Sequence, residues 1–417
     1  MSLLPRRCTS PHTPLPSPRF AERLRGCVRI GLGLALVAGL AGETVADDKS
    51  PALPVVAPAD AGLTARRMEA IDRIVAEGLR DGKMPGCVVL VGHDGKIVHR
   101  KAYGKRRVEP APEEMTVDTV FDLASLTKPI ATATSIHKLV EQGKIDLDAP
   151  VAKYIPAFAE NGKEKITVRH LMLHTSGLIP DNAIGDYALG PEKAWENLIG
   201  IKPVAALDEK FQYSDVNFLI LGKLVETVSG RPVNVFAREE FFAPLGMKET
   251  GYLPAKELMP RIAPTEKRGD TWITGFVHDP RAFALGGVAG HAGLFSTADD
   301  LAIYAQTLIN GGEWKGTRVL AAESVARMTE PHGVPGKAFR TCGWDNRSGF
   351  SSNRGDLLSP RAFGHGGFTG TGLWIDPEQK LFVVFLSNRV HPAPTKDTIV
   401  NPLIGRICTV AAAAIRE

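Results

Sequence analysis

Cysteine is scarce in this chain, with five residues in 417, and no two of them form a Cys-x-x-Cys pair. Zinc sites that use cysteine ligands depend on such closely spaced pairs. Only Cys87, Cys342 and Cys408 follow the first 46 residues. Three thiols allow at most one disulfide, so we expect these cysteines to be buried packing residues and predict no metal site.

Several enzyme motifs are also missing. Without a Gly-x-Ser-x-Gly stretch the chain has no nucleophile elbow of the α/β-hydrolase type, and no Gly-Lys-Ser/Thr sequence ends a P-loop. His170 and His174 have helical i,i+4 spacing, but no His-Glu-x-x-His motif is present, which favours structural hydrogen bonds over zinc. We therefore expect no cofactor and no metal.

The chain has no excess of one charge outside its N-terminal region. The formal net charge is +4, and residues 1–46 hold six arginines against Glu22 and Glu43. The remainder carries 44 basic and 44 acidic side chains. A nucleic-acid-binding surface requires a basic excess, so we expect no nucleic-acid partner.

No long apolar run suggests a membrane-spanning helix in the N-terminal region. Its apolar stretch, residues 30–41, has 12 residues and is too short to cross a bilayer. An arginine-bearing start and a small-residue site at Thr44-Val45-Ala46 predict a signal peptide over residues 1–46, with an uncleaved anchor as the alternative. We expect an exported protein, periplasmic or secreted, with residues 47–62 as a flexible linker rich in Pro and Ala.

Hydrophobic periodicity predicts an α+β domain over residues 63–417. Strands are expected near both ends of this region and helices at its two termini. The predicted elements are a helix over 64–83, strands over 87–91, 97–103, 372–375 and 381–386, and a helix over 398–414. We predict an antiparallel sheet built from about 63–124 and 290–417, with a mainly helical part inserted at about 125–289.

The stretch Val120–Pro129 is the first candidate for chemistry. Ser125 and Lys128 are three residues apart at the start of a helix predicted over 126–142, so they should share one face. A neutral lysine can activate a serine, and the free N–H groups of a helix start can stabilise an oxyanion. A second copy, Ser135 to Lys138, lies in mid-helix, where we expect a solvated face.

Two later stretches offer partners for Ser125. Tyr213, at a loop-to-helix junction, can relay protons if the charge of Lys128 lowers its pKa; the alternative is a hydroxyl bonded to a backbone carbonyl. His365 lies in a run rich in Gly and Thr that lets a ligand approach the backbone closely; the alternative is a surface histidine in a hairpin. His278, Asp279 and His291 lie in glycine-rich loops and are further candidates to line the cleft.

With these motifs the chain resembles the serine hydrolases of the class C β-lactamase and penicillin-binding-protein type, which include D,D-peptidases and esterases. The resemblance rests on Ser125-Leu-Thr-Lys128, Tyr213-Ser-Asp215 and His365-Gly-Gly367 in that order, and covers about residues 64–410. It implies that Ser125 is acylated, that Lys128 assists, and that Tyr213 acts as general base and then acid. It also implies an oxyanion hole from the N–H groups of Ser125 and Phe368, and a substrate wall at His365 and Gly367.

Two positions depart from the pattern of many relatives. Asp215 stands where they have Asn, and His365 where they often have the Lys that grips a substrate carboxylate. Both changes make the site less suited to an anionic substrate, although some D,D-peptidases have a histidine there. Arg389, just past the last strand, is a candidate for the missing charge; the alternative, which we favour from the sequence, is a surface arginine. Ser214 is an alternative proton carrier to Tyr213, because Ser214-Asp215-Val216 partly resembles the class A motif.

We therefore predict an exported serine hydrolase with a Ser125 acyl-enzyme, an esterase or a D,D-peptidase-like amidohydrolase. Its partner would be a small-molecule or peptide acyl substrate, including cell-wall peptide. A β-lactamase is one alternative. A non-catalytic protein that binds cell-wall fragments is another, since the substitutions at Asp215 and His365 weaken the substrate grip. The oligomeric state stays open.

Overall fold

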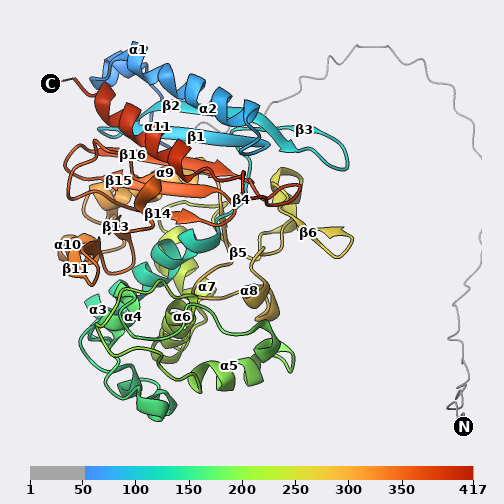
Figure 1. Ribbon diagram of the computed structural model, residues 1–417. Coiled ribbons are helices and arrows are strands. Elements are labelled where there is room, and N and C mark those ends of the chain that lie inside the picture. Colours follow the sequence, from blue (N-terminus) through green and yellow to red (C-terminus); the bar gives the residue numbers. More distant parts are fainter. Residues whose placement is uncertain (1–51, 417) are drawn as a thin grey trace, which may run out of the picture. The chain divides into compact units, whose positions relative to one another are not determined.

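The centre of the fold is a pair of strands from opposite ends of the sequence. In the computed structural model, which describes residues 52–416, β1 (Gly86–His93) pairs antiparallel with β16 (Leu381–Ser387), with Val88 opposite Leu386. They lie inside a nine-stranded antiparallel sheet of order β11-β12-β13-β14-β15-β16-β1-β2-β3 (Figure 1). The predicted α+β fold with an antiparallel sheet built from both ends is confirmed.

The remaining strands of this sheet are short except near its centre. They are β2 (Lys96–Arg107), β3 (Glu113–Glu114), β11 (His332–Val334), β12 (Ala338–Arg340), β13 (Asp345–Arg347), β14 (Phe363–Gly367) and β15 (Thr371–Asp376). Smaller sheets are formed by β4 (Phe121–Asp122), β5 (Gly251–Tyr252), β6 (Lys267–Arg268), β7 (Thr271–Trp272), β8 (Leu294–Ser296), β9 (Glu313–Trp314) and β10 (Thr317–Arg318).

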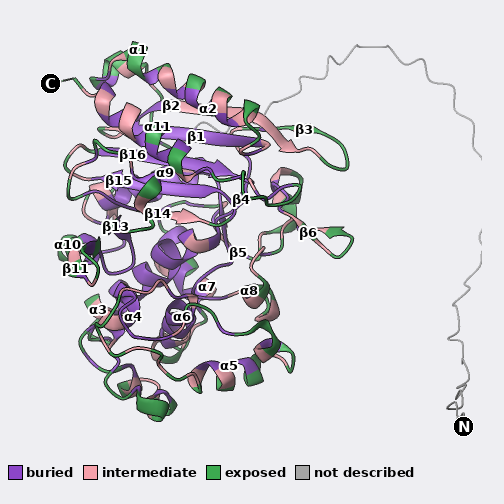
Figure 2. Cartoon of the chain, viewed as in Figure 1, coloured by how far each residue is buried: buried purple, intermediate pink, exposed green. Residues whose placement is uncertain are grey.

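Both faces of the central strands are covered, which explains why β1 and β16 carry apolar side chains on both faces and are polar only at their last residues, His93 and Ser387. Side chains alternate between faces of a strand. Val89 and Phe385 enter a core under α1 (Ala65–Met68), α2 (Ala70–Arg80) and α11 (Asn401–Ala414). Val88 and Leu386 enter the larger core, which includes α9 (Ala298–Ile309) and the inserted helices. Figure 2 shows the sheet and the central helices as the buried layers.

The helical part lies beside one edge of the large sheet (Figure 1). Its helices, with the one that precedes β11, are α3 (Thr134–Glu141), α4 (Val168–Leu173), α5 (Pro191–Ile199), α6 (Asp215–Ser229), α7 (Val233–Ala237), α8 (Pro280–Ala284) and α10 (Ala322–Thr329). None of the helices within residues 52–416 is long and apolar enough to cross a membrane.

Two sequence predictions concern the N-terminal region. The signal peptide predicted for residues 1–46 lies outside the described residues. The flexible linker predicted for 47–62 is wrong for its described part, because Leu53 is 1% exposed and Val55 bridges to Ile97 of β2. The buried Leu53 side chain and the backbone hydrogen bonds of Ile97 with Pro54 and Val56 hold the segment against the sheet.

Cys87, Cys342 and Cys408 are free and buried, as predicted. The strands β11–β13 were not predicted, because they have three residues each and lack a regular alternation.

Candidate active site

Ser125 lies on a strained turn between a strand and a helix. After β4, a 3₁₀ turn (Ala124–Leu126) leads into a π-helical segment (Lys128–Ala133) and then into α3. Ala124 has φ +47°, a left-handed conformation unusual for alanine, and its N–H donates to Asp122 Oδ1 at 2.8 Å. The range predicted as one helix, 126–142, is helical as far as Glu141, but its first half, to Ala133, is 3₁₀ and π-helix instead of α-helix. Strain and π-helical turns of this kind concentrate at functional sites.

Lys128 is fully buried, and its ammonium contacts three acceptors. Its Nζ lies 3.0 Å from Ser125 Oγ, 3.1 Å from the His291 carbonyl oxygen and 2.6 Å from Asp215 Oδ1. Burial lowers the pKa of Lys128, but the Asp215 carboxylate and Tyr213 outweigh it and raise the pKa above its usual range. Lys128 is thus an ammonium at neutral pH, and it is not the neutral base that the spacing suggested.

Tyr213 packs beside this ion pair. Its ring centroid lies 5.0 Å from Lys128 Nζ, and its hydroxyl is buried. Burial raises the pKa of Tyr213, and Asp215 adds to that rise, while Lys128 and Ser125 lower it by less. The expected lowering by Lys128 is present, but the net direction is upward, because burial of the hydroxyl, with a smaller contribution from Asp215, outweighs the lysine charge.

Ser214 has a different place. It is fully buried and caps α6: its hydroxyl accepts from the Asn217 N–H at 3.2 Å and donates to the Ile179 carbonyl at 2.7 Å. Of the two candidates for the proton carrier, Tyr213 is the one that faces the cavity beside Ser125. Ser135, the serine of the second Ser-x-x-Lys copy, is fully buried, and its hydroxyl donates to the Ala131 carbonyl. The solvated helix face predicted for it is therefore wrong.

His365 and Gly367 lie on β14, next to the Ser125 turn. His365 is 6% exposed, so the surface alternative is wrong; its Nδ1 lies 2.7 Å from the Gly366 carbonyl oxygen. Burial, then Arg340 and Lys128, hold its pKa well below the usual range, so the imidazole is neutral. At Gly367 a Cβ would lie 2.4 Å from the Leu123 carbonyl oxygen, so the close approach of the Ser125 turn requires glycine there.

These residues line one cavity of about 260 Å³. It brings together Ser125, Tyr213, His365, Gly367 and Phe368 of the predicted site, whereas Lys128 and Asp215 lie behind its wall. Its other lining residues are Asp345, Phe350, Gly366, Arg389, Ile399, Val400 and Asn401. His278 stacks on Phe368, with ring centroids 5.4 Å apart.

Asp279 and His291 also lie behind Lys128, with His291 Nε2 2.9 Å from Asp279 Oδ1. Their ligand atoms and that of Asp215 lie within 4.8 Å of one another, a set able to hold a cation. The Lys128 ammonium already contacts Asp215 and supplies the positive charge that a metal ion would bring, so these side chains need no metal ion to balance their charge.

The charges around Ser125 are paired, with one exception in the cavity wall. Lys128 pairs with Asp215, and the fully buried Arg340 lies 3.3 Å from Asp345. Within residues 52–416 the Arg389 guanidinium has no carboxylate partner; Nη1 donates to the Thr398 carbonyl at 3.0 Å, and the group lies 4.8 Å from the Phe368 ring centroid. Arg389 therefore sets a positive sign for the cavity. The sequence suggested that the negative charge of Asp215 would disfavour an anionic substrate. Because Lys128 pairs with Asp215, that part of the expectation no longer holds.

Sequence reasoning missed Asp345, Phe350 and Arg340. Phe350 packs on Tyr213 with ring centroids 5.0 Å apart, and Arg340 is the buried partner of Asp345. These residues come from β12, β13 and the loop after them, where no periodicity or turn motif marks a site. Only the folding of this segment against the Tyr213 loop brings them near Ser125.

The chain matches a known protein family. The family model described as Beta-lactamase matches residues 71–401, so the chain belongs to the beta-lactamase family. A protein of Escherichia coli (strain K12) named "Putative D-alanyl-D-alanine carboxypeptidase" is 33% identical over 86% of this chain and 90% of its own.

Two further comparisons agree. The "N-acetylmuramyl-L-alanine amidase" of Bacillus subtilis (strain 168) is 34% identical over 82% of this chain and 85% of its own. A solved structure titled "A class C beta-lactamase" superposes with a TM-score of 0.69 at 18% identity, covering 85% of this chain and 97% of that one. The resemblance to the class C β-lactamase and penicillin-binding-protein family is confirmed.

Proposed function

We propose that this protein is an exported serine hydrolase that cleaves an acyl amide of cell-wall type through an acyl-enzyme on Ser125. The observation that carries the proposal is the contact chain Ser125–Lys128–Asp215, with distances of 3.0 and 2.6 Å, at the wall of a cavity large enough for an acyl group. The names of the two relatives that are 33% and 34% identical, a carboxypeptidase and an amidase, support an amide substrate. Export rests on the predicted signal peptide.

The contacts suggest a proton route for acylation. As Ser125 Oγ attacks the carbonyl carbon, its proton passes to Lys128 while Lys128 passes one of its own to Asp215, so that Lys128 stays an ammonium. Tyr213, a phenol with a raised pKa, is protonated at neutral pH and suits the role of acid. It gives its proton to the leaving nitrogen as the C–N bond breaks, and it regains one from Asp215 through Lys128. Water then hydrolyses the ester and restores Ser125.

Neighbouring groups would shape the substrate. The main-chain N–H groups of Ser125 and Phe368 are the proposed oxyanion donors. His365, neutral and buried, offers an uncharged wall. Arg389 is the cation in the cavity without a carboxylate partner among the described residues, and a guanidinium binds a carboxylate through parallel hydrogen bonds. We therefore favour substrates with a carboxylate near the scissile bond.

A second candidate is hydrolysis of neutral short-chain esters. It is favoured by the apolar side chains of Phe350, Phe368, Ile399 and Val400 in the cavity wall. A β-lactamase and a non-catalytic binding protein stay alternatives, and one set of experiments separates them all.

The test is intact-protein mass spectrometry after exposure to a fluorophosphonate, followed by a substrate panel. We expect an adduct on the wild type and none on Ser125→Ala, with Ser135→Ala labelled like the wild type. Short-chain esters, D-Ala-D-Ala peptides, muramyl peptides and nitrocefin then rank the acyl groups. A folded wild type without an adduct or turnover would overturn the proposal and favour a binding protein.

A further inference from the structure

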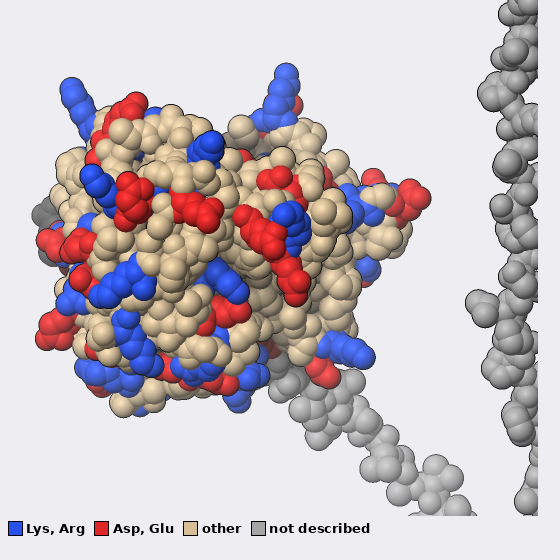
Figure 3. All heavy atoms as spheres, turned by 90° about the horizontal axis from the view of Figure 1, so that it is seen from below, with Lys and Arg blue, Asp and Glu red and all other residues tan. Residues whose placement is uncertain are grey.

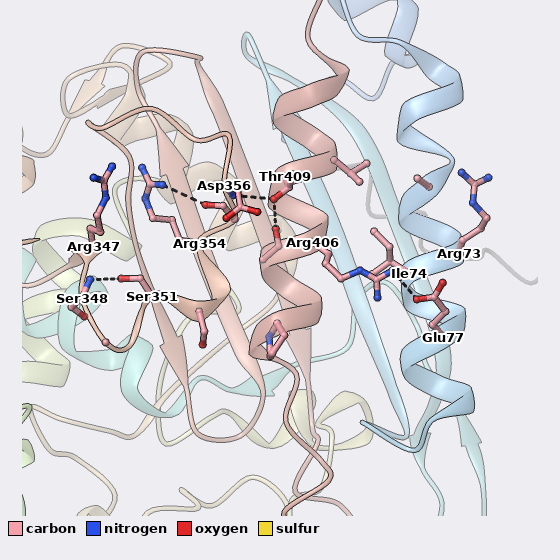
Figure 4. Close-up of a pocket in the computed structure, with 17 residues that line it drawn as sticks. Arg73, Ile74, Glu77, Arg347, Ser348, Ser351, Arg354, Asp356, Arg406 and Thr409 are labelled. Atoms are coloured by element: carbon pink, nitrogen blue, oxygen red, sulfur yellow. Dashed lines mark hydrogen bonds and ion pairs between the residues drawn. The ribbon is translucent and has the colours of Figure 1, made fainter. Parts of the chain in front are cut away.

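A second cavity, much larger than the one at Ser125, lies between α2, α11 and the loop after β13. We call it the arginine groove; its volume is about 1010 Å³. It is lined by Ala70, Arg73, Ile74, Glu77, Arg347, Ser348, Gly349, Ser351, Ser352, Arg354, Gly355, Asp356, Pro402, Gly405, Arg406, Thr409 and Val410 (Figure 4). We propose that the arginine groove binds a chain-like anion with repeated phosphate or carboxylate groups.

The charge of the groove carries this inference. It contains four arginines against two carboxylates, Glu77 and Asp356. Glu77 is already paired with Arg406 at 2.7 Å. Neither Arg73 nor Arg347 has an ion-pair partner within residues 52–416, and both are exposed. Figure 4 shows Arg347 and Arg354 on the loop side of α11, and Arg73 and the Arg406–Glu77 pair on the α2 side.

Arg354 shows that the groove is built rather than incidental. It is only 7% exposed, and its guanidinium donates to the carbonyls of Leu358, at 3.0 Å, and of Ser359. Its Nε is buried without a hydrogen-bond partner in the described chain. Burial lowers the pKa of Arg354, and the like charge of Arg347 lowers it further. A bound anion would relieve that repulsion.

The positive surface continues past the groove. An adjoining cavity of about 590 Å³ shares Ala70, Arg73 and Val410 with it and adds Arg66, Arg67 and Glu69. The two cavities together hold six arginines, no lysine and three carboxylates. Guanidinium groups match the fork geometry of phosphate and carboxylate better than ammonium groups do. On the face in Figure 3, by contrast, basic and acidic side chains are interspersed.

The groove adjoins the Ser125 cavity through one loop. Asp345 and Phe350 line the Ser125 cavity, whereas Arg347 and Ser351 of the same segment line the groove. At α11, Asn401 lines the first and Pro402 the second. An anion on Arg347 therefore acts on the loop that packs Phe350 against Tyr213. This link to turnover rests on the proposed function, while the binding itself does not.

The test measures binding to two chain-like anions, inorganic tripolyphosphate, which has no acyl bond, and poly-L-glutamate, for which Ser125→Ala is used so that its amide bonds stay intact. Titration calorimetry in low salt should detect at least one of them. The double variant Arg73→Gln/Arg347→Gln should raise the Kd about tenfold, since two exposed charge contacts together contribute on the order of one decade. Arg80→Gln is the matched control, an exposed arginine of α2 outside both cavities.

Each outcome decides the proposal. Binding of tripolyphosphate alone assigns phosphate, and binding of poly-L-glutamate alone assigns carboxylate. The proposal fails if neither binds, or if the double variant, folded by circular dichroism, binds like Arg80→Gln. Ser125→Ala should bind as the wild type does. If the wild type binds one of the anions but forms no acyl adduct on Ser125, the proposed function is overturned while the proposed anion site stands.

Discussion

Asp215→Asn is the sharpest test of the active-site electrostatics. The change keeps the shape of the side chain and removes the negative charge 2.6 Å from the buried Lys128 ammonium. Leaving a buried charge unpaired costs about 3–5 kcal/mol of unfolding free energy. Lys128 keeps two acceptors, Ser125 Oγ and the His291 carbonyl, and the Asp215 side chain is 20% exposed, so we expect the lower end, about 3 kcal/mol.

The loss of stability should depend on pH. In the wild type the folded pKa of Lys128 is raised, so its contribution is fully present below the unfolded lysine value and is lost only as the pH rises through the folded pKa. In Asp215→Asn, burial becomes dominant and lowers the folded pKa. At neutral pH the variant is destabilised because it buries an unpaired ammonium. The difference in unfolding free energy between the wild type and the variant should therefore shrink as the pH rises toward about 10.4, the unfolded value for lysine. Urea unfolding at pH 7 and pH 9.5 measures both values.

The effect on turnover separates two mechanisms. If Asp215 takes the proton that leaves Ser125 through Lys128, kcat should fall about 100-fold to 10,000-fold. If Tyr213 is the base instead, the uncancelled lysine charge lowers its pKa, and the pH profile moves to lower pH while activity is kept. The assay is kcat/KM on a chromogenic ester from pH 5 to 10. The exposed Asp208, replaced by Asn, is the control. Activity of Asp215→Asn within tenfold of the wild type would refute the proposed relay.

The other predictions concern four more positions. Tyr213→Phe should lower kcat about 100-fold on an amide but much less on an activated ester, whose leaving group needs no proton. Ser214→Ala should lower the unfolding free energy by about 1 kcal/mol through loss of the helix cap and leave kcat unchanged. A loss of kcat in Ser214→Ala together with an active Tyr213→Phe would make Ser214 the proton carrier. Arg389→Gln should raise KM about tenfold for a carboxylate-bearing peptide and leave KM for a neutral ester unchanged; equal effects on both would argue against a carboxylate contact. Gly367→Ala should cost about 1–3 kcal/mol in urea unfolding, because its Cβ meets the Leu123 carbonyl, and an unchanged midpoint would contradict that contact.

The sequence by itself determined the elements whose signals are local. The apolar runs predicted as strands over 87–91 and 97–103 are β1 and β2 of the structure, an antiparallel pair that turns at Asp94-Gly95. The three-residue spacing of Ser125 and Lys128 predicted that their side chains meet, and they lie 3.0 Å apart. Such features depend on backbone periodicity over a few residues, which the order of amino acids specifies directly.

Only the tertiary structure decided the charge state of the site. Whether Lys128 is a base or an ammonium depends on burial and on Asp215, which is distant in the sequence and arrives at the N-terminus of α6. Arg340 and Phe350 reach the site from strands and a loop with no pattern of their own. Ser135 and Ser125 have the same motif, yet one is sealed inside α3 and the other opens on a cavity. Spacing along the chain sets which side chains can meet, but solvation and charge partners are set by segments that meet only on folding, and the pKa of each group depends on these.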